Sequence, residues 1–174
     1  VSSLREAIVD KGIPVLATSS TCTFTLRDEY PHLLDVDNTG LREHIELATR
    51  FLWRKLDSGQ TLPLKNLPLK VVYHTPCHME KMGWALYTLE LLRLIPGLEL
   101  TVLDSRCCGI AGTYGFKREN YETSQAIGAP LFRQIEESGA DIVVTDCETC
   151  KWQIEMSTSK RCEHPITLLA KALG

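Results

Sequence analysis

Cys107-Cys108-Gly109-Ile110-Ala111-Gly112-Thr113-Tyr114-Gly115 is the stretch from which the rest of the chain can be interpreted, because two adjacent cysteines precede three glycines. A disulfide keeps its two α-carbons well apart, so a bond between neighbouring cysteines would close a strained ring. Two adjacent thiolates that point into one pocket are better explained as metal or cluster ligands. The glycines have no β-carbon, and we expect them to let the backbone pass close to a bulky inorganic group.

Three further cysteines extend this pattern. Cys77 lies upstream in His74-Thr75-Pro76-Cys77-His78, and Cys147 and Cys150 lie downstream with C-x-x-C spacing. The full pattern is C-x29-C-C-x38-C-x2-C. It predicts one site whose members are Cys77, Cys107, Cys108, Cys147 and Cys150, with Gly109 beside them.

Each cysteine group follows a predicted β-strand. Apolar runs at 69–74, 98–103 and 141–145 end shortly before cysteines, and helical periodicity predicts helices at 79–94 and 119–137. This alternation predicts an α/β fold, with a parallel sheet flanked by helices on both faces. The carboxyl ends of parallel strands share one edge, where ligands bind. We therefore expect the five thiols to meet at that edge.

The first sixty residues predict a shorter set of similar elements. We expect the end of a helix at 2–11, a strand at 13–18, a short helix capped within 19–22, and a longer helix at 41–56. Residues 61–68 contain two prolines and no periodicity, which is typical of a linker.

A short internal repeat relates the two parts. Residues 15–22 align with residues 143–150, so that Cys22 falls on Cys150 and Ser19 on Cys147. Cys22 is then either a ligand of an earlier module or a small core residue, and we favour the core residue.

The repeat leads to a prediction of domain organisation. Residues 1–60 are expected to be the C-terminal part of an upstream, truncated module, residues 61–68 a linker, and residues 69–174 a complete module. We also expect the chain to be a piece of a longer polypeptide.

Composition narrows the function classes. The 174 residues are 44% hydrophobic with a net charge of −3, so no basic surface for nucleic acid is evident. No apolar run approaches the length of a transmembrane helix. Seven cysteines without the spacing of a secreted disulfide scaffold favour a reducing compartment, by default the cytoplasm.

The five thiols leave more than one metal open. Buried cysteines can be purely structural, but an adjacent pair and a C-x-x-C at strand ends argue against that. Zinc takes four thiolates in a closed tetrahedral site, whereas five sulfurs suit a cluster with several iron atoms. His74 and His78 flank Cys77, and we expect ordinary structural roles for them, with a hydrogen bond to a cluster as the alternative. Cys162 is expected to be incidental.

The cysteine motifs resemble a known family. Cys77, Cys107-Cys108-Gly109 and Cys147-x-x-Cys150 are similar to the cysteine-rich CCG domain found in one of the heterodisulfide reductase subunits, in the glycolate oxidase iron–sulfur subunit and in lactate-utilisation proteins. The sequence around them (residues 73–83 and 145–153) resembles the family of C subunits of anaerobic glycerol-3-phosphate dehydrogenase, in its C-terminal half. The resemblance covers essentially the whole chain.

This resemblance implies a cofactor and partners. It implies that the five cysteines bind an iron–sulfur cluster of the 4Fe–4S type, which is non-cubane in the heterodisulfide reductase relative. It implies that electrons pass from flavoprotein catalytic subunits to membrane quinone, with the chain peripheral on the cytoplasmic face of the inner membrane. We expect no catalytic site for glycerol 3-phosphate in this chain. A zinc-stabilised or metal-free docking module, and a cluster-based redox catalyst, remain the alternatives.

Overall fold

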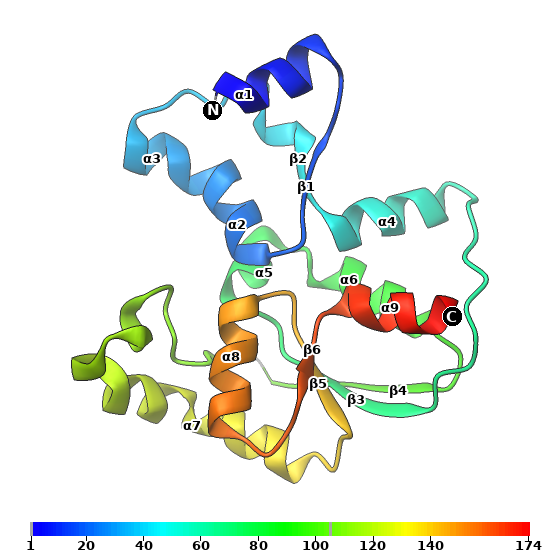
Figure 1. Cartoon of the computed structure of the whole chain (residues 1–174), viewed down its shortest axis with the longest axis vertical. Helices are drawn as coiled ribbons and strands as arrows, with labels where there is room; N and C mark the ends of the chain where they lie inside the picture. The colour runs from blue at the N-terminus through cyan, green and yellow to red at the C-terminus, as the bar shows by residue number, and fades with distance from the viewer. Residues whose placement is uncertain (1, 105) are drawn as a thin grey trace.

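Parallel β-sheet organises both parts of the chain in the computed structural model, which describes residues 2–104 and 106–174 (Figure 1). The larger sheet has the strand order β4-β3-β5-β6, and all its neighbours pair in parallel. Its strands are β3 (Leu69–Tyr73), β4 (Leu98–Val102), β5 (Ile142–Val144) and β6 (Cys162–Glu163). The predicted α/β class is confirmed, although β6 was not foreseen.

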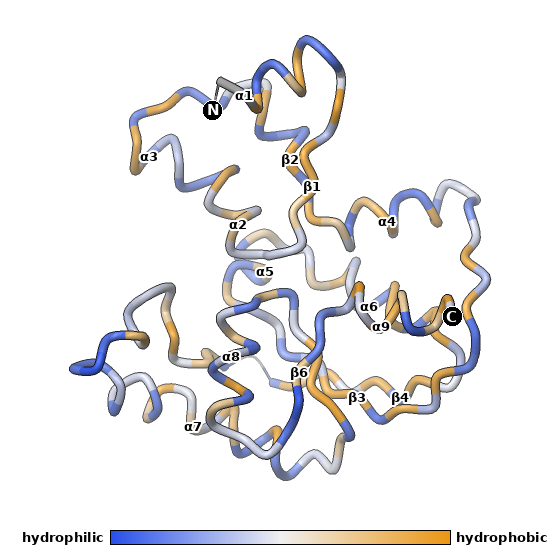
Figure 2. The backbone as a smooth tube through the Cα atoms, viewed as in Figure 1, coloured by the Kyte–Doolittle hydropathy of each residue, from blue (hydrophilic) through white to orange (hydrophobic). Residues whose placement is uncertain are grey.

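Helices cover both faces of this sheet. Alternate residues of a strand point to opposite faces. Val71 and Tyr73 accordingly pack with α6 and α9, whereas Val72 packs with α7 and α8. The apolar colouring of β3 and β4 in Figure 2 shows the same burial. The helices are α5 (Cys77–Met82), α6 (Ala85–Arg93), α7 (Tyr121–Glu137), α8 (Glu148–Ser157) and α9 (Pro165–Leu173).

The N-terminal part, blue to cyan in Figure 1, has its own two-stranded parallel sheet. β1 (Val15–Ala17) pairs with β2 (Ile45–Leu47) in this sheet. The surrounding helices are α1 (Ser2–Arg5), the π-helix η1 (Glu6–Asp10), α2 (Ser20–Phe24), the π-helix η2 (Thr25–Glu29), α3 (Tyr30–Leu34), the 3-10 helix η3 (Arg42–His44) and α4 (Ala48–Asp57). Two further 3-10 helices, η4 (Tyr114–Phe116) and η5 (Arg118–Asn120), precede α7. In the described ranges, every helix is too short or too polar to cross a bilayer.

The helix predicted over 41–56 is wrong in its first half, since a regular α-helix begins only at Ala48. Ile45 and Leu47 are fully buried in β2, and Glu46 between them is buried as well. Its carboxylate forms ion pairs with Arg50 at 3.3 Å and Arg54 at 3.0 Å. Apolar residues at 41, 45 and 47 fit a helix and a buried strand about equally, and pairing with β1 decides between them.

Two other local predictions need correction. The helix predicted over 79–94 is interrupted, because Gly83 adopts a left-handed conformation with φ of +70° and ends α5. Ser19 occupies the N-cap of α2, but its side chain makes no capping hydrogen bond. The segment 60–68 has no regular structure, as predicted, and Leu64 and Leu67 pack on the core.

A buried hydrogen-bond network joins the two parts around Asp146. Its carboxylate accepts hydrogen bonds from the Tyr73 hydroxyl at 2.6 Å and from Thr88 at 3.1 Å. Thr49 of the N-terminal part lies 3.5 Å from the same carboxylate, and the Ser20 N–H donates to the Asp146 carbonyl at 2.8 Å. Burial raises the pKa of Asp146 to about 6, against the opposing effect of these hydroxyl groups.

Candidate metal centre

The loops that follow β3, β4 and β5 carry the five cysteines of the predicted site. Cys77 begins α5, while Cys147 occupies the N-cap of α8. All five side chains line one cavity of about 130 Å³. The parallel register brings together groups that are thirty or more residues apart, because it sets the carboxyl ends of the strands side by side.

The sulfur atoms are close enough to interact directly. Cys108 Sγ lies 3.2 Å from Cys150 Sγ, and both residues are buried. The Gly109 N–H donates to Cys107 Sγ at 3.3 Å, and Thr149 Oγ1 lies 3.2 Å from Cys147 Sγ. Cys77 is the one exposed member of the five. The site therefore has a buried end and an end open to solvent.

The thiols alternate in acidity as a result of this crowding. Hydrogen bonds from Cys108 and Cys77 lower the pKa of Cys107, and a hydrogen bond from Cys150 lowers the pKa of Cys147 to about 5. The donating thiol of Cys108 has its pKa raised to about 12 in return. Five thiolates would repel one another in this space, so complete deprotonation needs positive charge at the centre.

The side chains around the cavity provide no such charge. Its other lining residues are neutral or a histidine, with no Lys or Arg among those described: Thr21, Pro76, His78, Ile110, Ala111, Gly112 and Thr149. Soft thiolates with no cationic side chain suit a metal ion or an iron–sulfur cluster, which brings its own positive charge. The residues present therefore fit such a group.

The glycines act differently from the sequence-based expectation. Gly109 has φ of +90°, and a β-carbon there would lie 2.0 Å from the carbonyl oxygen of Ser124 in α7. Gly115 likewise abuts Ser124, whereas a β-carbon at Gly112 would meet nothing within 4 Å. The close approach that requires Gly109 is thus to a helix backbone. Gly109 still contacts the site through its N–H bond to Cys107.

The N-terminal part supplies one wall of the cavity, which the sequence patterns did not predict. Thr21 of α2 reaches Cys147 with its hydroxyl, at an Oγ1–Sγ distance of 3.5 Å. His78 Nδ1 lies 3.1 Å from the same hydroxyl, and the His78 ring stacks on Phe24 at 4.7 Å between centroids. The repeat is the only signal that could have suggested this contact, because it aligns Thr21 with Thr149 beside the cysteines.

His74 lies at the buried end of the site. It follows β3 directly, and its N–H donates to the Val144 carbonyl at 2.9 Å. One of its ring nitrogens forms a group with Cys108 Sγ and Cys150 Sγ in which all three atoms lie within 4.8 Å of one another. Burial lowers the pKa of His74 to about 4, so the imidazole is neutral near pH 7.

The two remaining cysteines lie outside this cavity lining. Cys22 is exposed on α2, so the expectation that it is a core residue was wrong. The helix turns Thr21 toward Cys147 and leaves the next side chain in solvent. Cys162 is 1% exposed and packs in the core from β6.

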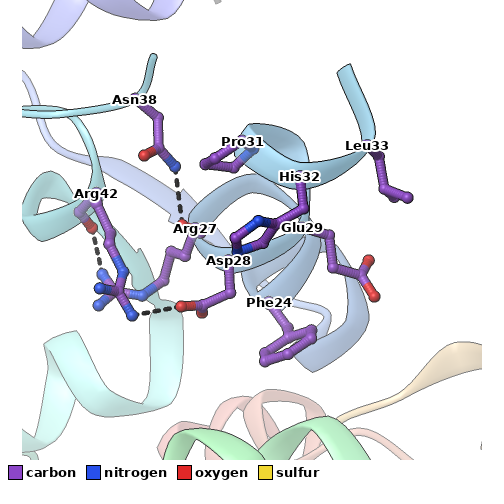
Figure 3. Close-up of a pocket in the computed structure, with 9 residues that line it drawn as sticks. All are labelled: Phe24, Arg27, Asp28, Glu29, Pro31, His32, Leu33, Asn38 and Arg42. Atoms are coloured by element: carbon purple, nitrogen blue, oxygen red, sulfur yellow. Dashed lines mark hydrogen bonds and ion pairs between the residues drawn. The ribbon is translucent and has the colours of Figure 1, made fainter. Parts of the chain in front are cut away.

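A larger hollow in the N-terminal part, of about 510 Å³, lacks comparable chemistry (Figure 3). Arg27 donates to the carbonyls of Arg42 and Ile45, and Arg42 pairs with Asp28. Asn38 donates to the carbonyls of Leu26 and Arg27. These polar groups hold the 35–42 loop on η2, so the hollow is better explained as a structural feature.

Comparison with known proteins gives consistent results. Residues 71–155 match the profile of the cysteine-rich domain family CCG. The chain is 86% identical over all its 174 residues to the C subunit of the anaerobic glycerol-3-phosphate dehydrogenase of Escherichia coli K12, and it spans 44% of that relative. It is 32% identical to lactate utilization protein A of Bacillus licheniformis, over 76% of this chain and 58% of the relative. It is 33% identical to an uncharacterized iron–sulfur protein of Methanocaldococcus jannaschii, over 57% of this chain and 20% of the relative.

Proposed function

We propose, from the premise that this chain belongs to the cysteine-rich CCG domain family through residues 71–155, that it binds an iron–sulfur cluster and transfers electrons through it. The observation that carries the proposal is the shared cavity of Cys77, Cys107, Cys108, Cys147 and Cys150. Five soft donors exceed the four that zinc takes in a closed site, and they suit a 4Fe–4S type of cluster, in either its cubane or its non-cubane form.

The bound cluster supplies reversible one-electron redox chemistry, and the chain controls its surroundings. Cys108, Cys147 and Cys150 hold it at the buried end, where the apolar neighbours Ile110 and Ile154 restrict water. The hydroxyl of Thr21 and the N–H of Gly109 are placed to donate to ligand sulfurs. Such donors stabilise negative charge on sulfur and so raise the reduction potential.

The partners follow from the relative that this chain resembles most fully of those described above. We propose that the chain acts within an anaerobic glycerol-3-phosphate dehydrogenase. In this complex it accepts electrons from flavoprotein catalytic subunits and delivers them to membrane quinone. We further propose peripheral attachment on the cytoplasmic face of the inner membrane.

The domain organisation is part of the same proposal. Residues 69–174 would be a complete module, since they contain the matched range 71–155 and the larger sheet. Residues 1–60 would be the end of an upstream module, with 61–68 as the linker. The separate sheet of β1 and β2 supports this division.

Anaerobic purification with iron, acid-labile sulfide and zinc analysis tests the cofactor. Iron and sulfide in a cluster ratio support the proposal, whereas stoichiometric zinc without sulfide supports a docking module instead. Cys108→Ser should lose the visible absorption of the cluster. Cys22→Ser is the matched control, because Cys22 is exposed outside the cavity lining, and it should keep that absorption.

The electron-transfer step is tested in the assembled dehydrogenase. Cys108→Ser should stop quinone reduction but leave glycerol 3-phosphate oxidation with an artificial acceptor intact. Loss of both activities would contradict the assignment of this chain to electron transfer alone.

A further inference from the structure

His74 is a buried side chain with no polar partner in the part of the chain that the structure describes. It is 1% exposed, and neither Nδ1 nor Nε2 has a hydrogen bond within residues 2–104 and 106–174. A neutral imidazole carries one N–H donor and one lone pair. Leaving both unused in the interior is costly, and buried polar groups are almost always paired. A partner for this ring is therefore to be sought outside the protein chain.

The surroundings of the ring indicate the chemistry of that partner. His74, Cys108 and Cys150 are all buried, and one ring nitrogen and the two sulfurs lie within 4.8 Å of one another. Metal–nitrogen bonds of about 2.0 Å and metal–sulfur bonds of about 2.3 Å let one metal atom hold two such donors up to about 4.4 Å apart. Small side-chain rotations thus suffice for one atom to reach all three.

The other two histidines near the cysteines are already engaged. His164 Nε2 lies 2.8 Å from the Thr18 carbonyl oxygen, and its Nδ1 accepts from the Ile166 N–H at 3.1 Å. His78 Nδ1 contacts Thr21 Oγ1 at 3.1 Å. Only His74, of these three, has both nitrogens available. Its position is set by the end of β3, where the His74 N–H bonds to Val144, so the ring is held in place before any metal binds.

We propose that His74 is a metal ligand of this centre, binding the same metal atom as Cys108 and Cys150. The centre would then have mixed nitrogen and sulfur coordination at its buried end. The inference rests on the proposed function for the identity of the metal as cluster iron. The same three donors would also bind a single soft divalent ion such as Co²⁺ or Zn²⁺.

Pulsed electron paramagnetic resonance of the iron–sulfur-loaded full chain, with ¹⁵N-labelled histidine, tests direct ligation. We expect a nitrogen hyperfine coupling characteristic of a bound imidazole, in the paramagnetic state of the cluster. His78→Gln should keep this coupling, which assigns it to His74 without any change at His74 itself. A wild-type spectrum without such a coupling, or its loss in His78→Gln, would overturn the inference.

A cobalt titration of the metal-free chain gives an independent measurement. His74→Gln should weaken Co²⁺ binding by at least about tenfold and shift the d–d absorption bands, because one nitrogen ligand is removed. His44→Gln is the matched control, since His44 is exposed. Circular dichroism checks the fold of each variant. Unchanged Co²⁺ affinity and spectrum in a folded His74→Gln protein would contradict the proposal, and if that variant does not fold the nitrogen coupling decides.

The two proposals fail in different ways. Iron and sulfide that load normally without nitrogen coupling would overturn the role of His74 and leave the cluster proposal standing. A chain that takes up no iron, but whose Co²⁺ binding depends on His74, would give the opposite result.

Discussion

Thr21 Oγ1 lies 3.5 Å from Cys147 Sγ, although 126 residues separate the two in sequence. The contact joins the N-terminal part of the chain to a cysteine of the larger module. It also places a hydroxyl group where it can donate to a ligand sulfur, so the N-terminal part is positioned to influence the cluster that we propose.

Replacing this hydroxyl should change the reduction potential. In Thr21→Val we expect a lower potential of the bound cluster, because a donor that stabilises negative charge on sulfur is lost while the side-chain volume is kept. Thr21→Ser keeps the hydroxyl and should stay near the wild-type value. A redox titration monitored by electron paramagnetic resonance measures both. Equal potentials in Thr21→Val and wild type would show that the contact does not tune the cluster.

Asp146 should make the stability of the metal-free chain depend on pH. Its pKa is raised from the usual 3.8 to about 6 by burial, so the folded state binds a proton that the unfolded state has released. The stabilisation from the neutral acid is fully present below pH 3.8 and is lost as pH rises through about 6. A shift of this size corresponds to roughly 3 kcal/mol.

Urea unfolding between pH 4 and 7 measures this effect. The free energy of unfolding of wild type relative to Asp146→Asn should fall over that interval, because asparagine does not titrate. Comparison with the variant removes the contributions of the other carboxyl groups. A constant difference across the interval would show that the Asp146 pKa is not raised.

Gly109→Ala should destabilise the fold. Its β-carbon would lie 2.0 Å from the carbonyl oxygen of Ser124, at a residue with φ of +90°. Displacing a helix backbone and straining this conformation together should cost more than about 2 kcal/mol. Gly112→Ala is the control, since it has φ of +66° and open space, and the backbone term alone should cost about 1 kcal/mol. Thermal unfolding compares them, and equal losses would place the cause in the backbone conformation alone.

The buried end of the cysteine site should matter most for metal retention. Cys150→Ser should reduce bound iron more than Cys77→Ser, because Cys150 is buried 3.2 Å from Cys108 whereas Cys77 is exposed. A serine buried there is a harder and weaker ligand for iron than a thiolate. Iron content after gel filtration measures the difference, and greater loss from Cys77→Ser would reverse this order.

The cysteine pattern and the strand–helix alternation determined much of this protein without coordinates. Strand periodicity placed β3, β4 and β5, and parallel pairing then required Cys77, Cys107 and Cys147 to meet at one edge. These features depend on local periodicity and on a general rule for parallel sheets, so they are legible in a single sequence.

Tertiary structure decided the rest. Residues 45–47 form a strand because β1 is there to pair with them, although their spacing equally fits a helix. Gly109 is required by the backbone of α7, and Cys22 is exposed because α2 turns Thr21 toward Cys147 instead. The lack of a protein partner for the His74 ring, within the described ranges, likewise depends on which groups surround it after folding. Spacing along the chain specifies an element and its edge, but only packing between distant segments determines which side chain fills each position.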